Sequence, residues 1–358
     1  MNNSRQPNTS LFKKFAQNRA GLLSVVYIVV MVLIAVFAYL IIPNKTKDAN
    51  QGELSIKSKP PGFEVLMLEI PLENQKNTNV KDYFLGKEVQ SVQYPVLKYE
   101  INNDTLIYIP YTDSALEVVY KLPMTDFDGK NPIQKKKFWL GTDKQGRDYL
   151  SRILLGTRVS LSVGIVSVSI ALLIGVFLGG VSGYFGGKVD QGIMWFVSVF
   201  WSIPTILMVV AITLALGKGF WQVFLAIGLT MWVEIARIVR GQVLSVKQSQ
   251  YVIAAQALGY SHWRILRKHI LPSVIPSIVV VSAANFASAI LMESGLSFLG
   301  LGVQPPTSSW GMMIKDSYSE ILLGKPYLAI IPGVAISTLT LSFMLVGNAI
   351  RDVLDVKN

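Results

Sequence analysis

Few residues in this sequence have side chains that could carry out covalent or metal chemistry. The 358 residues contain no cysteine and two histidines, His262 and His269, which excludes thiolate metal sites, disulfides and histidine-rich metal centres. Both histidines fall in one short basic segment, where no set of nucleophile, histidine and acid can be assembled. We therefore predict no cofactor, no metal and no catalytic residue, and we expect both histidines to be surface or partner contacts.

A nucleotide-driven motor would need a phosphate-binding loop of the form Gly-x-x-x-x-Gly-Lys-Ser/Thr. The nearest candidate is Gly187-Lys188, but Ser182 stands at the position of the first glycine and Val189 replaces the hydroxyl residue. Lys188 is therefore expected to be an ordinary loop cation. The chain is not expected to be an enzyme, and any hydrolysis of ATP would need a separate subunit.

The elements that would position a site are those of a membrane protein. Hydrophobic residues make up 51% of the chain and the mean hydropathy is +0.44. Charged residues make up 15%, against about 25% in a soluble domain. A helix crosses the hydrocarbon core with about 20 apolar residues. Five stretches without Lys, Arg, Asp or Glu are long enough: residues 20–44, 159–187, 191–217, 269–292 and 326–350.

A sixth, shorter span is predicted at Gly219–Val233, provided that Glu234 and Arg237 lie at the membrane interface. Residues 294–314 are also uncharged, but Pro305-Pro306 interrupts helical continuity, so we expect an external loop or a shallow re-entrant element there. The predicted fold class is an all-α polytopic membrane protein with six transmembrane helices.

Basic residues beside the spans predict the orientation. Residues 1–19 carry four basic residues and no acid, and residues 235–268 carry six and no acid. Both segments, and the tail at 351–358, should therefore be cytoplasmic. The basic residues of 135–158 disagree with this orientation, and we expect residues 147–156 to form a helix along the outer interface.

Residues 45–138 are the part that resembles a soluble domain. They contain thirteen lysines and thirteen acidic residues, so this insert is neutral although the whole chain carries a net charge of +11, and no nucleic-acid surface is predicted. Four runs rich in Val, Ile, Leu and Tyr predict short strands: Phe63–Ile70, Val89–Ile101, Thr105–Tyr111 and Leu116–Leu122. We expect a small β-rich external domain, with a partly ordered loop as the alternative.

The most informative local pattern lies at residues 247–272. Four residues recur at i, i+3, i+4 and i+7 and therefore share one face of a predicted helix: Tyr251, Ala254, Ala255 and Leu258. Gly259 follows, where a left-handed residue commonly ends a helix, and Ser261 could cap a second helix that ends by Pro272. Small residues on an exposed face would suit docking of a rigid partner. The alternative is an amphipathic loop packed on its own membrane domain.

Ala254-Ala255-x-x-x-Gly259, followed by His269-Ile270-Leu271-Pro272, resembles the EAA coupling loop of permease subunits in bacterial ABC importers. The resemblance implies that the segment seats in a cleft of an ATPase subunit. The implied coupling residues are Tyr251, Ala254, Ala255, Leu258, Gly259, His269, Leu271 and Pro272. Ile253 stands where the family usually has a glutamate, so docking by shape rather than by that charge is implied.

Four further stretches narrow the resemblance to the dipeptide, oligopeptide and nickel branch, the DppC/OppC-like permeases. They are GTDKQGRD at 141–148 with Ser151-Arg152, GYFGG at 183–187 with Asp190, ARIVRGQ at 236–242, and LSFLGLGVQPPT at 296–307 with Ser309-Trp310-Gly311. The tail Arg351-Asp352-x-Leu354-Asp355 also fits, although Val356 stands where proline is usual. The resemblance covers 139–358 closely and 1–44 loosely, and it implies the ABC importer type I permease fold, with the core permease domain at 139–350.

The resemblance also implies a function and partners. The chain would be the permease subunit of an ATP-driven importer in the bacterial inner membrane, moving di- or oligopeptides by alternating access, with nickel chelates also open. Two ATPase subunits, a second homologous permease subunit and an external substrate-binding protein would complete it. Two other classes remain: an ion-gradient-driven secondary transporter and a membrane-anchored envelope scaffold. Neighbouring genes for two ATPases and a second permease would distinguish them.

Glu293, at the outer end of the fifth predicted span, is the candidate residue for the translocation path. Ionisable groups in such places usually face a cavity or a partner, where this carboxylate could attract the amino terminus of a peptide. The alternative is an interfacial residue tied to backbone amides of the Leu296–Gly302 turn. Pro204, Pro276 and Pro332 fall in predicted spans and could kink them.

Overall fold

The computed structural model of the chain describes residues 15–72, 80–102, 104–112, 118–127, 131–217 and 219–354. The chain divides into two compact units. Unit 1 comprises Met1–Val30, Ser160–Val303 and Ala335–Asn358. Unit 2 comprises Met31–Val159, which includes the predicted insert, and Gln304–Val334.

Membrane-length helices belong wholly or in their greater part to unit 1. Within the described residues, five helical segments are long and apolar enough to cross a membrane. They are α2 (Arg19–Val36), α5 (Tyr149–Phe185), α8 (Phe220–Lys247), the run His262–Phe298 and α14 (Tyr327–Leu354). Two shorter helices, α6 (Gly187–Trp201) and α7 (Thr205–Leu216), make a sixth span if they are counted together.

The stretch 191–217 was predicted as one span. In the structure it is broken between Trp201 and Thr205. The axes of α6 and α7 meet at 86°. Pro204 precedes α7 with φ −54° and ψ 126°, outside the helical region, and a proline also disfavours helical geometry in the residue before it. The predicted deformation at Pro204 is confirmed. Pro276 and Pro332 lie inside continuous helices.

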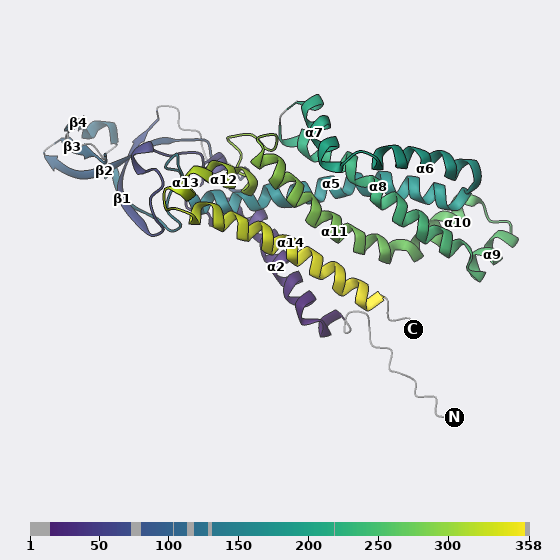
Figure 1. Cartoon of the computed structure of the whole chain (residues 1–358). Helices are drawn as coiled ribbons and strands as arrows, with labels where there is room; N and C mark the ends of the chain where they lie inside the picture. Colours follow the sequence, from purple (N-terminus) through teal and green to yellow (C-terminus); the bar gives the residue numbers. More distant parts are fainter. Residues whose placement is uncertain are drawn as a thin grey trace. The chain divides into compact units, whose positions relative to one another are not determined.

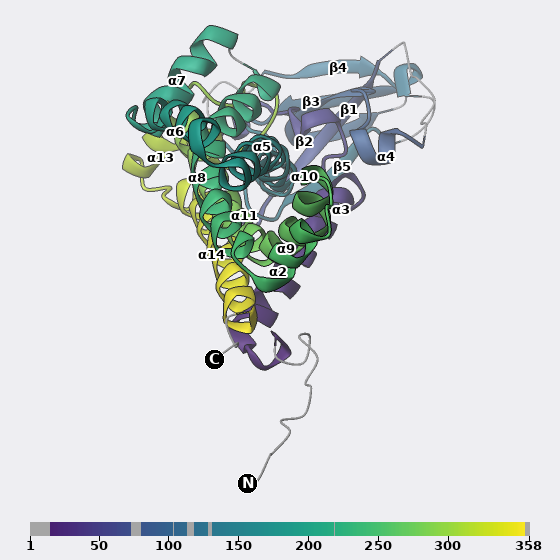
Figure 2. The ribbon, with the colours of Figure 1, turned by 90° about the vertical axis from the view of Figure 1, so that its right-hand side faces the viewer.

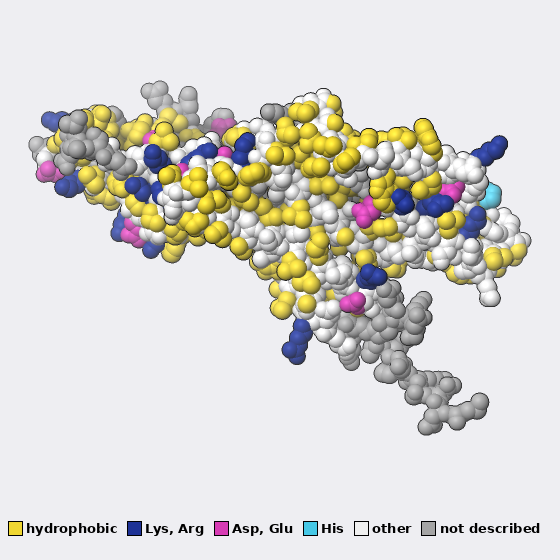
Figure 3. Space-filling view, in the orientation of Figure 1, with side chains coloured by type: hydrophobic (Ala, Val, Ile, Leu, Met, Phe, Trp, Pro, Cys, Tyr) yellow, Lys and Arg dark blue, Asp and Glu magenta, His cyan; other side chains and the backbone are white. Residues whose placement is uncertain are grey.

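The short span predicted at Gly219–Val233 is the first part of the longer helix α8, which packs against α7 and α11 (Leu271–Phe298) (Figures 1 and 2). Three glycines at four-residue spacing on α5 face α8: Gly175, Gly179 and Gly183. A Cβ at Gly175 would lie 2.7 Å from the Ile235 Cβ. Small residues let membrane helices approach closely, and this stripe fixes α5 against α8. Apolar side chains cover much of the surface over α7 in the view of Figure 3, and Leu207 and Leu214 are exposed residues of this helix.

Residues 294–314 form no membrane-length helix, as predicted: α11 ends at Phe298, and α12 (Trp310–Asp316) follows a non-helical stretch. In unit 2, α12 packs beside the start of α5, and α13 (Tyr318–Leu322) packs against α12. The Trp310 indole Nε1 donates to the Ile153 carbonyl at 2.9 Å. A Cβ at Gly156 would lie 2.5 Å from this indole, so glycine is required for that contact.

The helix predicted along the outer interface at residues 147–156 is the first part of α5, which begins at Tyr149 and runs unbroken to Phe185. Two of the basic residues that suggested an interface, Arg147 and Arg152, are instead buried beside a carboxylate. Asp143 contacts Arg147 at 2.6 Å and Arg152 at 3.6 Å, with side-chain exposures of 8% or less. One carboxylate therefore partly offsets the two guanidinium charges inside unit 2, which explains why these residues do not follow the charge rule for orientation.

Unit 2 contains a five-stranded antiparallel sheet in the order β4-β3-β2-β1-β5. Its strands are β1 (Phe63–Pro71), β2 (Ser91–Asn102), β3 (Thr105–Pro110), β4 (Tyr120–Pro123) and β5 (Ile133–Phe138). Short helices lie between or before them: α3 (Ala38–Ile41), α4 (Asp82–Leu85) and the 3₁₀ turns Lys47–Ala49, Leu54–Ile56 and Met124–Phe127. A core cluster covers the sheet with Leu68, Val96, Leu106, Phe127 and Ile133.

Three of the predicted strands agree with β1, β2 and β3, and the fourth begins later than predicted. Residues 113–117, which include its predicted start, lie outside the described residues. The strand β5 was not predicted, because its sequence contains Lys135, Lys136 and Lys137. Lys135 and Lys137 both pair with Glu64 of β1. Lys136 points to the other face, where it donates to Gln93 at 2.9 Å and burial lowers the pKa of its ammonium group.

Candidate functional site

The segment at 247–272 folds as a helix, a glycine turn and a helix, as predicted. The helix α9 (Gln250–Ala257) is followed by Gly259 with φ +74°. Two backbone bonds close the helix end: Gly259 N–H donates to Gln256 at 3.0 Å, and Tyr260 N–H donates to Ala255 at 3.2 Å. This pair of bonds is the Schellman motif, whose left-handed residue favours glycine. Ser261 precedes α10 (His262–Ile265) in an extended conformation but makes no side-chain capping bond, so that predicted bond is absent.

The predicted face of α9 is only partly exposed. Tyr251 is 47% exposed, Leu258 is 72% exposed and Ala254 is also exposed. Ala255 is 4% exposed and points inward with Val252, so its predicted place on the exposed face is wrong. In a helix with 3.6 residues per turn, consecutive residues point in directions about 100° apart, so Ala254 faces solvent while Ala255 faces the core. Trp263 was not among the predicted site residues and is 59% exposed.

Pro272 does not end the second helix. A π-helical turn at Leu266–Ile270 leads directly into α11, so Pro272, near the start of α11, lies inside a continuous helical run. His269 stacks on Tyr260 with ring centroids 5.8 Å apart. Leu271 is half-buried and Pro272 exposed. The Tyr251 hydroxyl lies 2.9 Å from Ser273 Oγ, which ties α9 to α11.

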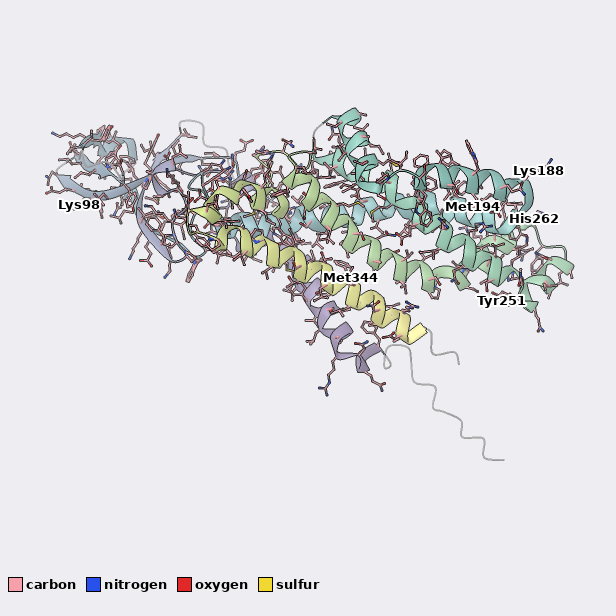
Figure 4. All side chains as sticks on the ribbon, in the orientation of Figure 1. Lys98, Lys188, Met194, Tyr251, His262 and Met344 are labelled. Atoms are coloured by element: carbon pink, nitrogen blue, oxygen red, sulfur yellow. The ribbon has the colours of Figure 1, made fainter. Side chains whose placement is uncertain are left out.

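Hydrogen bonds also join the segment to α5 and α8. The Tyr184 hydroxyl, near the end of α5, lies 2.9 Å from Nδ1 of His262. Lys247 Nζ, at the end of α8, donates to the Tyr184 carbonyl at 2.6 Å. Figure 4 labels His262 and Tyr251 on the two helices of the segment. Tyr184 was not predicted as a site residue, although it lies in the GYFGG stretch.

A charge pair lies on the neighbouring turns of α6 and α8. Arg240 donates to both carboxylate oxygens of Asp190 at 2.6 Å, and Ser182 Oγ of α5 donates to the same carboxylate. Two-point contact between a guanidinium and a carboxylate is among the stronger ion pairs. The ends of three helices are therefore joined beside the segment.

A cavity of about 280 Å³ lies inside unit 1, where α6 and α7 break. Residues on α8 and α11 complete its lining, among them Glu234 and Asn285. Glu234 is exposed. The Arg237 guanidinium lies over the Trp201 ring, 3.4 Å from its centroid. The sequence analysis placed Glu234 at the interface and did not identify this cavity.

Glu293 does not line this cavity. Its side chain is fully buried, and Ser297 Oγ donates to its Oε1 at 2.6 Å. Val303 N–H donates to the same Ser297 oxygen at 3.3 Å, and the backbone of Gly302 approaches it so closely that a Cβ would not fit. This geometry supports the alternative in which Glu293 anchors the turn after α11.

Comparison with known proteins places the chain in a family. Residues 171–357 match the family of inner membrane components of binding-protein-dependent transport systems. Residues 9–61 match the N-terminal transmembrane domain of oligopeptide transport permease C. The MetNI methionine ABC transporter, in an inward-facing conformation, aligns with a TM-score of 0.48 and 19% identity over 56% of this chain and 96% of that one.

The alignments with curated relatives cover most of each relative's length. The chain is 40% identical over 232 residues to the glutathione transport system permease protein GsiD of Pectobacterium atrosepticum, covering 65% of this chain and 77% of the relative. It is 41% identical to the dipeptide transport system permease protein DppC of Bacillus subtilis, covering 61% and 68%. It is 40% identical to the oligopeptide transport system permease protein OppC of that organism, covering 66% and 78%. The chain therefore belongs to the binding-protein-dependent ABC importer permeases, in the DppC/OppC-like group, as a non-catalytic membrane component that works with separate ATPase subunits.

Proposed function

We propose that this chain is the transmembrane permease subunit of an importer for di- and oligopeptides in the bacterial inner membrane. The named relatives belong to glutathione, dipeptide and oligopeptide transport systems, which supports short peptides as cargo. Two ATPase subunits, a second homologous permease subunit and an external substrate-binding protein complete the importer. Both termini and the segment 247–272 lie in the cytoplasm.

The exposed apolar surface of the segment 247–272 carries this proposal. Tyr251, Leu258 and Trp263 present large side chains to solvent within one short helical hairpin. Contiguous apolar patches on a surface mark interaction sites. The segment has no acidic side chain, so the ATPase cleft recognises its shape and apolar surface, together with its basic residues.

Transport proceeds by alternating access. ATP binding closes the pair of ATPase subunits, and the cleft that holds α9 and α10 moves with them. The bonds of Tyr184 to His262 and to Lys247 pass this motion to α5 and α8. Tilting of these helices opens the path to the other side of the membrane.

An ion-gradient-driven transporter and an envelope scaffold are both less suited to the observations. The family to which the chain belongs works with ATPase subunits. A scaffold would leave the exposed hairpin at 247–272 without a partner.

Assembly with the ATPase tests the proposal. Ala254→Arg adds a long cation to an exposed position of α9, and Val189→Arg adds the same group to an exposed position of α6. Ala255→Arg is unsuitable, because Ala255 is buried and the variant would disturb the chain itself. We expect Ala254→Arg to lose co-purification of the ATPase and peptide uptake, while Val189→Arg keeps both. Normal assembly and uptake by Ala254→Arg would show that docking occurs elsewhere.

A further inference from the structure

The cavity at the break between α6 and α7 is lined by the residues that flank the break, Trp201, Ile203 and Thr205. Non-helical backbone at membrane depth is tolerated where protein covers it or where it lines a cavity. The cavity volume of about 280 Å³ is near the lower limit of ligand pockets, about 300 Å³. It fits one end of a small ligand rather than a long chain.

Glu234 gives this cavity a negative charge. The structure describes every residue of α8, and Glu234 is the one acidic residue among them. At about 1.5 Å per residue it lies roughly 21 Å from the start of that helix, within the segment Phe220–Lys247 that is long and apolar enough to cross a membrane. Its carboxylate is exposed to the cavity. Acidic groups within membrane-spanning segments usually mark a substrate or ion pathway.

The nearest basic residue on α8 does not neutralise this charge. Arg237, one turn further along, places its guanidinium over the ring of Trp201. No ion pair joins Glu234 to another residue of the described ranges. The carboxylate is therefore available to a cation that enters the cavity.

Asn285 supplies a second polar group from α11. Its side chain is 3% exposed and lines the same cavity, and its Nδ2 has no hydrogen-bond partner among the residues that the structure describes. A buried donor without a partner is unfavourable, and a ligand carbonyl oxygen in the cavity would accept its hydrogen.

We infer that this cavity is a subsite for the amino-terminal end of a short peptide, an inference that rests on the proposed peptide transport. Glu234 pairs with the α-ammonium group, and Asn285 donates to the first carbonyl oxygen. Met208, Met231 and Met292 also line the cavity. Their flexible thioether side chains adapt to different shapes, which suits a carrier of varied first residues.

The absence of cysteine from the chain allows a direct test in the assembled importer. Thr205→Cys places one thiol in the cavity at an exposed position, and Lys188→Cys places one at an exposed position in the first turn of α6, outside the cavity. The rate of maleimide labelling is measured with alanyl-phenylalanine and with its N-acetyl derivative, which lacks the ammonium group. ATP-driven uptake of alanyl-phenylalanine is measured in parallel in the same proteoliposomes.

We expect alanyl-phenylalanine to slow labelling of Thr205→Cys at least threefold and the N-acetyl derivative to have no effect. Adding Glu234→Gln should abolish the protection while the ATPase still co-purifies, and labelling of Lys188→Cys should not change. Three results would overturn the subsite, provided that the unmodified importer still takes up the dipeptide: equal protection by both compounds, no protection by either, or protection that persists in Glu234→Gln. Absence of dipeptide uptake by the unmodified importer would overturn the proposed cargo, and the subsite with it.

Discussion

The Tyr184 hydroxyl lies 2.9 Å from Nδ1 of His262 and joins the end of α5 to the beginning of α10. The two residues are far apart in the sequence, and their rings also meet at a centroid distance of 5.7 Å. The backbone of Tyr184 accepts a further bond from Lys247 of α8. Tyr184 of α5 thus contacts both the segment 247–272 and the end of α8.

Tyr184→Phe is expected to weaken coupling without unfolding the chain. The change keeps the ring contacts with Phe185 and His262 and removes one hydrogen bond, worth about 0.5–1.5 kcal/mol. We expect peptide uptake per ATP hydrolysed to fall several-fold in proteoliposomes. Tyr83→Phe, at an exposed position of unit 2, is the control. An unchanged ratio of uptake to hydrolysis in Tyr184→Phe would remove this bond from the mechanism.

Adjacent glycines on α5 should respond differently to alanine. A Cβ at Gly179 would overlap the carbonyl oxygen of Ala236 on α8, whereas nothing lies within 4 Å of a Cβ at Gly180. Overpacking of this kind costs about 1–3 kcal/mol, while alanine at Gly180 should be neutral or slightly stabilising. Thermal unfolding of the purified permease measures the difference. Equal melting temperatures for the two variants would show that α5 and α8 do not approach as closely as described.

Asp143→Asn should destabilise unit 2 strongly. The carboxylate balances Arg147 and Arg152, both of which are buried, and an unpaired buried charge costs about 3–5 kcal/mol. Glu64→Gln removes a carboxylate that also contacts two basic residues, Lys135 and Lys137, but does so in solvent. We expect no measurable loss from that variant. Limited proteolysis of the region 45–148 reports on both, and similar digestion patterns would contradict the buried network.

Gly259→Ala should weaken docking of the ATPase by distorting the turn between α9 and α10. An L-residue with φ +74° is strained by about 1–2 kcal/mol, so we expect ATPase affinity to fall about fivefold to thirtyfold. Asparagine tolerates this conformation better, and Gly259→Asn should lose less. Gly241→Ala, on α8 with open space around it, should have little effect. If Gly259→Asn bound the ATPase more weakly than Gly259→Ala, the left-handed conformation at position 259 would be contradicted.

The sequence predicted the features that depend on local pattern. Uncharged stretches predicted the helices, and Gly259 predicted the left-handed turn because glycine adopts that backbone conformation at little cost. It did not predict β5, because Lys136 lies on the inner face and Lys135 and Lys137 on the outer one, so no apolar alternation remained. It misplaced Ala255, because periodicity alone does not show which edge of a helical stripe meets the core.

Other features depend on contacts between distant residues. The charge rule for membrane proteins misled the prediction for 147–156, since Arg147 and Arg152 are buried against Asp143 rather than placed beside lipid headgroups. The cavity at Glu234 needed the position of Asn285, fifty-one positions further along. No local pattern of α8 contains that information, so the sequence could not predict that Glu234 lines a cavity.

Labelling of a single cysteine at Leu258 tests the central claim most directly. The side chain is 72% exposed on the coupling segment, and the chain otherwise has no thiol. With a membrane-impermeant maleimide, Leu258→Cys should react in inside-out vesicles, stay unreactive in right-side-out vesicles, and be protected when the ATPase subunits are added back. Reaction from the outer side, or unchanged labelling with the ATPase bound, would contradict the account.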